Sequence, residues 1–206
     1  MANWLVIDLE ATTDEGGWPV AQMEIIEIGA VIADSRGQCL ASWQSFVRPQ
    51  RNRLLSDFCR TLTHIEQTDI DSAPGLPAAQ QAFDQWLQPW LPSLPGWLSW
   101  GNYDRQQLAL EWQQQAISTP LAGLAHHNLK QLFTRQHGIS GNRCHGLPAA
   151  LQQAGLQFDG SLHRALDDAR NIARLLAHID LATLSAAGDA SQRLVHTGAP
   201  FYPPGD

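Results

Sequence analysis

Cysteine is scarce in this 206-residue chain, which has three, Cys39, Cys59 and Cys144, and no CxxC pair. An odd number of cysteines without paired spacing argues against a disulfide framework or a zinc ribbon and favours free thiols in a reducing compartment. Long apolar runs are missing as well. No stretch approaches the roughly 18 residues of a membrane span, and the N-terminal run is broken by Asp8. We therefore expect no signal peptide and no membrane span, and we expect a soluble, cytoplasmic protein.

Positively charged residues are also few. The chain has 13 lysines and arginines against 20 aspartates and glutamates, which gives a formal net charge of −7. Proteins that bind long nucleic-acid duplexes usually carry a basic surface, since neutralising phosphates releases counterions. The charge balance therefore counts against a protein that coats duplexes. It is compatible with an enzyme that holds a few terminal nucleotides, because metal ions can supply positive charge locally.

What the chain does have is an ordinary globular composition, with 44% hydrophobic and 16% charged residues, which suits one domain with a buried core. Apolar runs predict strands in the first part, and helical signals dominate from Pro74 onward. The predicted strands are 3–9, 24–33, 39–48 and 97–100, and the predicted helices are 77–91, 105–115, 130–137, 146–154 and 164–182. Three strands first, as an antiparallel meander, and alternating elements later indicate an α/β fold with a mixed sheet covered by helices.

The C-terminal segment 183–206 differs in composition from the rest of the chain. It is rich in Gly, Pro, Ser and Thr and ends in GAPFYPPGD, which is incompatible with a regular helix. We expect residues 1–182 to form one domain and 183–206 to be a tail that packs on the surface or is partly disordered.

Two carboxylates stand at the end of the first predicted strand. Side chains alternate faces with a period of two, so Asp8 and Glu10 share a face with Trp4 and Val6 and lie about 6–7 Å apart along the strand. Hard oxygen ligands so placed can hold Mg²⁺ or Mn²⁺. They can also simply mark the point at which the strand meets water, and the D-x-E spacing alone leaves both interpretations open.

The last predicted helix carries a second acidic pair. Asp168 falls on the apolar stripe with Ile172 and Leu175, whereas Asp167 falls on the wet face with Asn171. Helix capping or a favourable interaction with the helix dipole explains Asp167 well and Asp168 poorly. An unpaired buried charge is expensive, so Asp168 needs a partner, and a metal ion would provide one.

Two further residues are candidates for the same site. Asp104 follows the predicted strand 97–100 and opens a helix, where an aspartate serves as an N-cap or as a metal ligand with equal plausibility. His163 precedes Asp168 by five residues, about 140° around a helix axis, so we place it on the approach to the helix. An imidazole titrates near neutrality and can accept a proton from water, although a structural role is also open for one of eight histidines.

Together these motifs resemble those of the DEDDh 3′→5′ exonuclease family, which includes the proofreading subunit of the bacterial replicative polymerase, ribonuclease T and oligoribonuclease. The five catalytic positions of that family are filled in the right order, by Asp8, Glu10, Asp104, His163 and Asp168. The segments IDLEATT, EIIEIGAV, LTHIEQTDID, WGNYDRQQL and HRALDDARNIARLL look like the branch that contains histone-mRNA and small-RNA 3′-end exonucleases and their bacterial relatives. That branch favours RNA.

The resemblance implies an RNase H-like fold in which the four acidic positions bind two Mg²⁺ or Mn²⁺ ions and Asp8 contacts both. It implies that His163 takes a proton from the water that attacks the last phosphodiester of a nucleic acid with a free 3′ end, releasing a 5′-monophosphate. By the same analogy Thr12, His64 and Ile65 border the pocket for the terminal nucleotides, and the last two stack on bases. Some relatives work as dimers, so a homodimer is possible.

Other conspicuous residues have simpler interpretations. Several tryptophans have helical or strand spacing typical of the core rather than of base stacking: Trp86, Trp90, Trp97 and Trp100. A basic run fits a solvated face better than a phosphate contact: Arg48, Arg51, Arg53 and Arg60. The pair His126-His127 has no spacing typical of metal ligands.

Three other functions compete with an RNA exonuclease. The first is the same chemistry on DNA, in proofreading or repair. The second is a non-catalytic scaffold of the same fold, which we expect to lack at least one of the acidic positions. The third is a small-molecule phosphodiesterase or phosphatase that uses the same metals.

Overall fold

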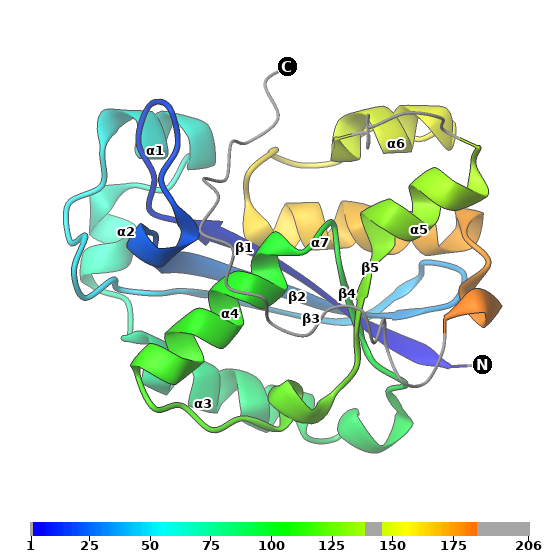
Figure 1. The fold of residues 1–206 in the computed structure, drawn as a ribbon, viewed down its shortest axis with the longest axis horizontal. Coiled ribbons are helices and arrows are strands. Elements are labelled where there is room, and N and C mark those ends of the chain that lie inside the picture. The colour runs from blue at the N-terminus through cyan, green and yellow to red at the C-terminus, as the bar shows by residue number, and fades with distance from the viewer. Residues whose placement is uncertain (1, 139–145, 185–206) are drawn as a thin grey trace.

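The computed structural model describes residues 2–138 and 146–184, which form a five-stranded sheet with helices on both faces (Figure 1). The strands are β1 (Asn3–Ala11), β2 (Ile25–Asp34), β3 (Cys39–Phe46), β4 (Trp97–Ser99) and β5 (His126–Asn128). Their order is β3-β2-β1-β4-β5; β2 is antiparallel to β1 and β3, and β4 is parallel to β1 and β5. The predicted mixed sheet that begins with an antiparallel meander is therefore confirmed, whereas β5 was not predicted.

Seven helices surround this sheet in the described part of the chain. They are α1 (Asp57–Thr63), α2 (Gln67–Asp71), α3 (Leu76–Leu87), α4 (Tyr103–Gln114), α5 (Leu129–Gln136), α6 (Leu147–Gln153) and α7 (Ala165–Arg174). Each helix predicted from Pro74 onward is present. The helices α1 and α2 were not predicted, because seven and five residues are too few to establish a helical period.

The alternation of side chains along β1 separates two apolar clusters. Trp4 and Val6 pack into the cluster formed with α5, α6 and α7. Leu5, Ile7 and Leu9 pack on the opposite face, into the cluster formed with α3 and α4. Figure 1 shows these two groups of helices on either side of the sheet. The face shared by Trp4 and Val6, predicted to carry the two carboxylates, is thus the face that α7 covers.

The last helix is shorter than predicted. α7 ends at Arg174, and 3-10 turns follow at Leu175–His178 and Leu181–Thr183. The leucines of the first turn stay fully buried in the cluster beneath α7. Packing against the sheet is thus retained where α-helical hydrogen bonding stops, because burial contributes more to such segments than helix propensity does.

Several expectations from composition can be compared with the structure. Trp97 is buried, and the other three tryptophans assigned to the core pack against the two apolar clusters. Cys39 and Cys59 are free thiols, as predicted, while Cys144 and residues 185–206 of the predicted tail lie outside the described residues. Over the described ranges, no helix has the length and apolar character needed to cross a membrane.

Candidate active site

Strand β1 delivers two carboxylates to the face that α7 covers. Asp8 lies opposite Gly29 of β2, and a side chain at Gly29 would come within 2.1 Å of the backbone of Ala165. Gly29 is therefore the position that lets the first residue of α7 approach the sheet closely. This close approach brings the start of α7 over the end of β1.

Helix α7 holds Asp168 over these two residues. Asp168 is 6% exposed and lies on the same buried stripe as Ile172, as predicted. Its carboxylate accepts hydrogen bonds from the backbone N–H groups of Arg164, at 3.1 Å, and of His163. Asp168 therefore does both things that were expected of it. It points inward, and it also caps the start of α7, because the residues just before the helix fold back onto its first turn.

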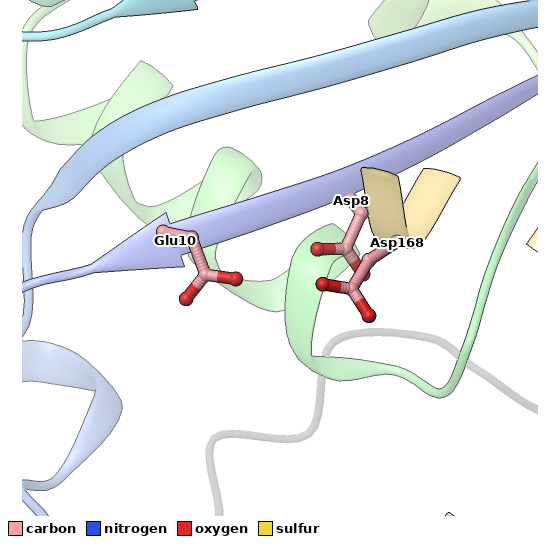
Figure 2. A group of neighbouring side chains, drawn as sticks. All are labelled: Asp8, Glu10 and Asp168. Atoms are coloured by element: carbon pink, nitrogen blue, oxygen red, sulfur yellow. The ribbon is translucent and has the colours of Figure 1, made fainter. Parts of the chain in front are cut away.

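Asp8, Glu10 and Asp168 form one group, here called the acidic cluster. Each residue offers an oxygen, and these oxygens all lie within 4.8 Å of one another. In Figure 2 the side chains of Asp8 and Glu10 leave β1 on one side, and Asp168 points to the same place from α7. Glu10 and Asp168 are buried, while Asp8 keeps part of its surface accessible. Residues from the two ends of the domain therefore share one small volume.

Negative charge is in excess in the acidic cluster, and the nearby Arg164 opposes it only weakly. Burial, followed by the negative charges of Asp168 and Asp104, raises the pKa of Asp8 well above its usual range. Burial and then Asp168 do the same to the pKa of Glu10. Burial also raises the pKa of Asp168 to about 7, even though its backbone hydrogen bonds oppose that change. Like charges held together in this way favour protonation or the binding of a cation.

Asp104 lies beside the acidic cluster rather than within that set of three oxygens. It belongs to the first turn of α4 and is buried, and its Oδ1 accepts the backbone N–H of Leu9 at 3.1 Å. Leu9 separates Asp8 from Glu10 in β1, so Asp104 approaches the strand from its edge. No side chain caps the first turn of α4 at Asn102, and Asp104 faces β1 instead. Burial raises the pKa of Asp104 to about 6, and the hydrogen bond from Leu9 opposes this rise.

The segment before α7 positions His163. It is half-buried, lies two residues before the helix and has a left-handed backbone, with φ of 60°. The prediction that Asn171 lies on the wet face was wrong, because this residue is fully buried. Its amide oxygen accepts the backbone N–H of Asp159, and its amide nitrogen donates to the backbone C=O of the same residue. Asp167 accepts the backbone N–H of Ser161 at 3.0 Å. The loop that carries His163 is therefore tied to α7 at several points.

The predicted pocket residues have different environments. Thr12 is buried just beyond β1, and its hydroxyl accepts the backbone N–H of Glu24 at 2.9 Å. His64 is exposed at the C-terminal end of α1. Ile65 is fully buried in a small cluster with Ile26 and Cys59, so it presents no surface to a base in this arrangement. The roles of all three in substrate binding stay predictions.

One ion pair near the site, with a buried glutamate, was not predicted. Glu27 is opposite Glu10 across β1 and β2 and is completely buried. It accepts hydrogen bonds from Nη2 of Arg164, at 2.9 Å, and from the backbone N–H of Ala165, at 3.1 Å. Gln44 also donates to it. The signal was present in the sequence as a glutamate inside an otherwise apolar strand, but its partner is distant in the chain.

The chemistry of the acidic cluster fits a divalent metal. All of its donors are carboxylate oxygens, the ligands that hard cations such as Mg²⁺ and Mn²⁺ prefer. The strongest charges acting on Asp8 are negative, so a cation there would offset an existing repulsion. His126 and His127 lie outside this group of three oxygens.

Comparison with known proteins places this geometry in a family. Residues 5–176 match the family model described as Exonuclease. Human 3'-5' exoribonuclease 1 is 30% identical over 177 residues, a match that covers 82% of this chain and 50% of that protein. The 3'-5' exonuclease eri1 of Schizosaccharomyces pombe is 28% identical over 202 residues, covering 84% of this chain and 66% of that protein. The chain thus spans about half the length of the human relative.

Solved structures agree with the sequence matches. The nuclease domain of 3'hExo, described as a DEDDh family member bound to rAMP, is similar with a TM-score of 0.77 at 28% identity, over 86% of this chain and 90% of that one. Cell-death related nuclease 4 is similar in fold, with a TM-score of 0.74 at 24% identity, over 86% of this chain and 63% of that one. Given the extent of the family match and the shared fold, the chain belongs to the DEDDh exonuclease family of RNase H-like proteins.

Proposed function

We propose that this protein is a metal-dependent 3′→5′ exoribonuclease that removes nucleotides one at a time from a free 3′ end. The observation that carries the proposal is the convergence of three carboxylates, the buried Glu10 and Asp168 and the partly accessible Asp8, with oxygens within 4.8 Å of one another. Membership of the exonuclease family supports the reaction class. The preference for RNA draws support from the human relative, named an exoribonuclease, and from the similar nuclease domain bound to rAMP.

The acidic cluster and Asp104 are the proposed ligands of two Mg²⁺ or Mn²⁺ ions. The oxygens of Asp8, Glu10 and Asp168 lie within 4.8 Å of one another, so these three residues would hold the ions together, and Asp8 is the residue that we expect both ions to share. Asp104 completes the set from the edge of β1. When bound, the two ions stabilise negative charge on the attacking and leaving oxygens of the phosphodiester.

The remaining steps involve His163 and the water molecule that attacks the phosphodiester. His163 accepts a proton as this water attacks the terminal phosphorus, and the bond from phosphorus to the 3′ oxygen of the preceding nucleotide breaks. The products are a 5′-monophosphate and a chain one nucleotide shorter with a new 3′ hydroxyl. The ties between α7 and the loop of His163 hold the backbone that carries this residue, which reduces the entropic cost of the step.

A 5′-labelled single-stranded RNA with a free 3′ hydroxyl tests the proposal. With Mg²⁺ or Mn²⁺ the label should run as a ladder that shortens one nucleotide at a time, and EDTA should stop the reaction. Asp8→Asn and Asp168→Asn should abolish the ladder. Asp180→Asn is the matched control, because Asp180 is exposed, caps the 3-10 turn Leu181–Thr183 and lies outside the acidic cluster.

The competing functions predict other results. Faster degradation of a DNA oligonucleotide of the same sequence would contradict the preference for RNA. Binding of RNA without any shortening would indicate a scaffold. Cleavage of a model phosphodiester without a ladder would indicate a small-molecule phosphodiesterase. A blocked 3′ end that leaves the rate unchanged would contradict exonuclease action.

A further inference from the structure

Glu27 lies next to the acidic cluster but does not belong to it. It is opposite Glu10 in the antiparallel pair of β1 and β2, and its side chain has no exposed surface. One of its oxygens accepts from Nη2 of Arg164 and from Gln44, and the other accepts from Nε of Arg164 and the backbone N–H of Ala165. Four donors fill the lone pairs of a carboxylate, so Glu27 has no oxygen to offer to a metal ion.

Arg164 connects Glu27 to Asp168. Arg164 is the extended residue immediately before α7, with φ of −118°. Its guanidinium binds both oxygens of Glu27, with Nε at 3.2 Å and Nη2 at 2.9 Å, and lies over the ring of Phe46 on β3, 5.3 Å from the ring centroid. Its backbone N–H donates to Oδ2 of Asp168 at 3.1 Å. The side chain of Arg164 is thus fixed to the sheet, while its backbone holds the carboxylate of Asp168.

The same ion pair also fixes the chain directly after His163. The left-handed backbone of His163, with φ of 60°, is unfavourable for a residue with a Cβ and persists only where the surroundings hold it. Two residues before His163, the backbone of Ser161 is bonded to Asp167, and one residue after it Arg164 is bonded to Glu27. The backbone of the candidate general base is therefore held on both sides, and the second attachment depends on Glu27.

We propose that Glu27 and Arg164 are positioning residues that hold the carboxylate of Asp168 in place for metal binding and fix the backbone of His163. This inference rests on the proposed function, because it takes Asp168 to be a metal ligand. Strand β2, which carries Glu27, lies between β1 and β3 in the sheet, so the ion pair ties the start of α7 to a strand that is paired on both sides. Partners that orient metal ligands typically contribute tenfold to a hundredfold to metal affinity.

A purely electrostatic effect of the ion pair on metal binding would have a different sign. By charge alone, removal of the negative Glu27 should weaken the binding of a cation, and removal of the positive Arg164 should strengthen it. Removal of both charges should then leave the affinity close to that of the wild type. If the pair positions Asp168, all three changes weaken binding, so the sign of the change separates the two explanations.

Mn²⁺ binding to the full chain, followed by the electron paramagnetic resonance signal of the free ion, tests the inference without any use of activity. Glu27→Gln, Arg164→Met and the double variant should each weaken Mn²⁺ binding about tenfold. The double variant should bind no more weakly than the weaker single variant, because both changes break the same contact. It should also fold more readily than Arg164→Met, which leaves the buried charge of Glu27 without its partner.

Asp34 and Arg36 provide a matched control. They form an ion pair at the opposite end of β2, where Asp34 is paired with Asn3 at the start of β1. Asp34 also accepts the backbone N–H groups of Arg36 and Gln38, each at 2.9 Å. The double variant Asp34→Asn with Arg36→Met should bind Mn²⁺ like the wild type, even where it lowers the unfolding temperature. Thermal unfolding of every variant verifies that the binding data refer to folded protein.

The possible failures are distinguishable. If Asp168→Asn weakens Mn²⁺ binding while the double variant of Glu27 and Arg164 binds like the wild type, the positioning role is wrong and the proposed function stands. If Arg164→Met strengthens binding, the ion pair acts through its charges, and the positioning role is again wrong. If the wild type binds no Mn²⁺, or Asp168→Asn binds as tightly as the wild type, both proposals lose their basis. If neither variant of Arg164 folds, Glu27→Asp decides the question, because it keeps the charge and shortens the side chain, so that only the positioning role predicts weaker binding.

Discussion

Glu24 and the acidic cluster are two sets of largely buried carboxylates at the same end of the sheet, since Ile25 pairs with Ala11 at the end of β1. The carboxylate of Glu24 accepts the backbone N–H groups of residues 50, 51 and 52 at 2.7 to 3.1 Å. Nε of Arg51 lies 3.7 Å from it. In the acidic cluster the strongest charges acting on Asp8 are negative.

This difference in hydrogen bonding and neighbouring charge distinguishes the structural role of Glu24 from the functional role that we propose for the acidic cluster. Glu24 has its acceptor capacity filled by the protein, so its burial stabilises the loop that follows β3. The acidic cluster keeps negative charge in excess, which costs stability in the absence of a cation and leaves oxygens available to one. Burial alone does not distinguish the two sets; the sign of the neighbouring charges does.

The largest effect is expected for Asp8→Asn. Loss of this proposed metal ligand should reduce the rate of RNA shortening by about 10⁴-fold, since metal stabilisation of the transition state is worth several kcal/mol. In EDTA the same variant should unfold at a higher temperature than the wild type, because one of the mutually repelling charges is gone. Single-turnover kinetics and thermal unfolding at about pH 8 measure the two effects. A lower unfolding temperature in EDTA would show that the charges of the acidic cluster do not destabilise the metal-free protein.

His163→Ala should separate chemistry from metal binding. Loss of a general base lowers the rate by about 10²- to 10³-fold at neutral pH. The backbone N–H of residue 163 still reaches Asp168 in this variant, so Mn²⁺ affinity should stay at the wild-type value. The rate of RNA shortening and the Mn²⁺ affinity, measured on the same preparation, distinguish the two roles. Equal losses in both would assign His163 to the structure of the metal site instead.

Glu24→Ala should produce the reverse pattern. Three backbone N–H groups lose their acceptor, which should lower the free energy of unfolding by about 2–3 kcal/mol. Urea unfolding measures the loss, with the exposed Glu15→Ala as control. Mn²⁺ affinity of the folded variant should be retained. Weakened Mn²⁺ binding with unchanged stability would mean that Glu24 belongs with the functional carboxylates.

The smallest effect is a dependence of stability on pH in the metal-free protein. Asp168 and Asp104, with pKa values raised to about 7 and about 6, hold protons in the folded state at pH values where the unfolded chain has released them. The contribution of these two groups to the free energy of unfolding in EDTA should therefore be greatest below about pH 4 and should fall as the pH rises toward 7. With saturating Mn²⁺ the trend should reverse, because the ligands must be deprotonated. Urea unfolding across this range measures both, and Asp168→Asn should flatten the slope in EDTA.

Much of the site could be predicted because its signals are local. The period of β1 places Asp8 and Glu10 on one face, and the period of α7 places Asp168 on its buried stripe. Asn171 was misplaced because its amide is satisfied by Asp159, a partner outside the helix that no periodic pattern reports. The short strand β5 was missed for a similar reason, since three residues carry no period.

By itself the sequence determined which residues share a face of each strand and helix, because those periods follow from backbone geometry. Only the tertiary structure decided which faces meet. It decided that α7 approaches β1 closely at Gly29, that Glu27 pairs with Arg164, and that Asp104 reaches the backbone of Leu9. These contacts join residues far apart in the chain, and their free energy depends on distances and neighbouring charges that exist only after the sheet and its helices have assembled.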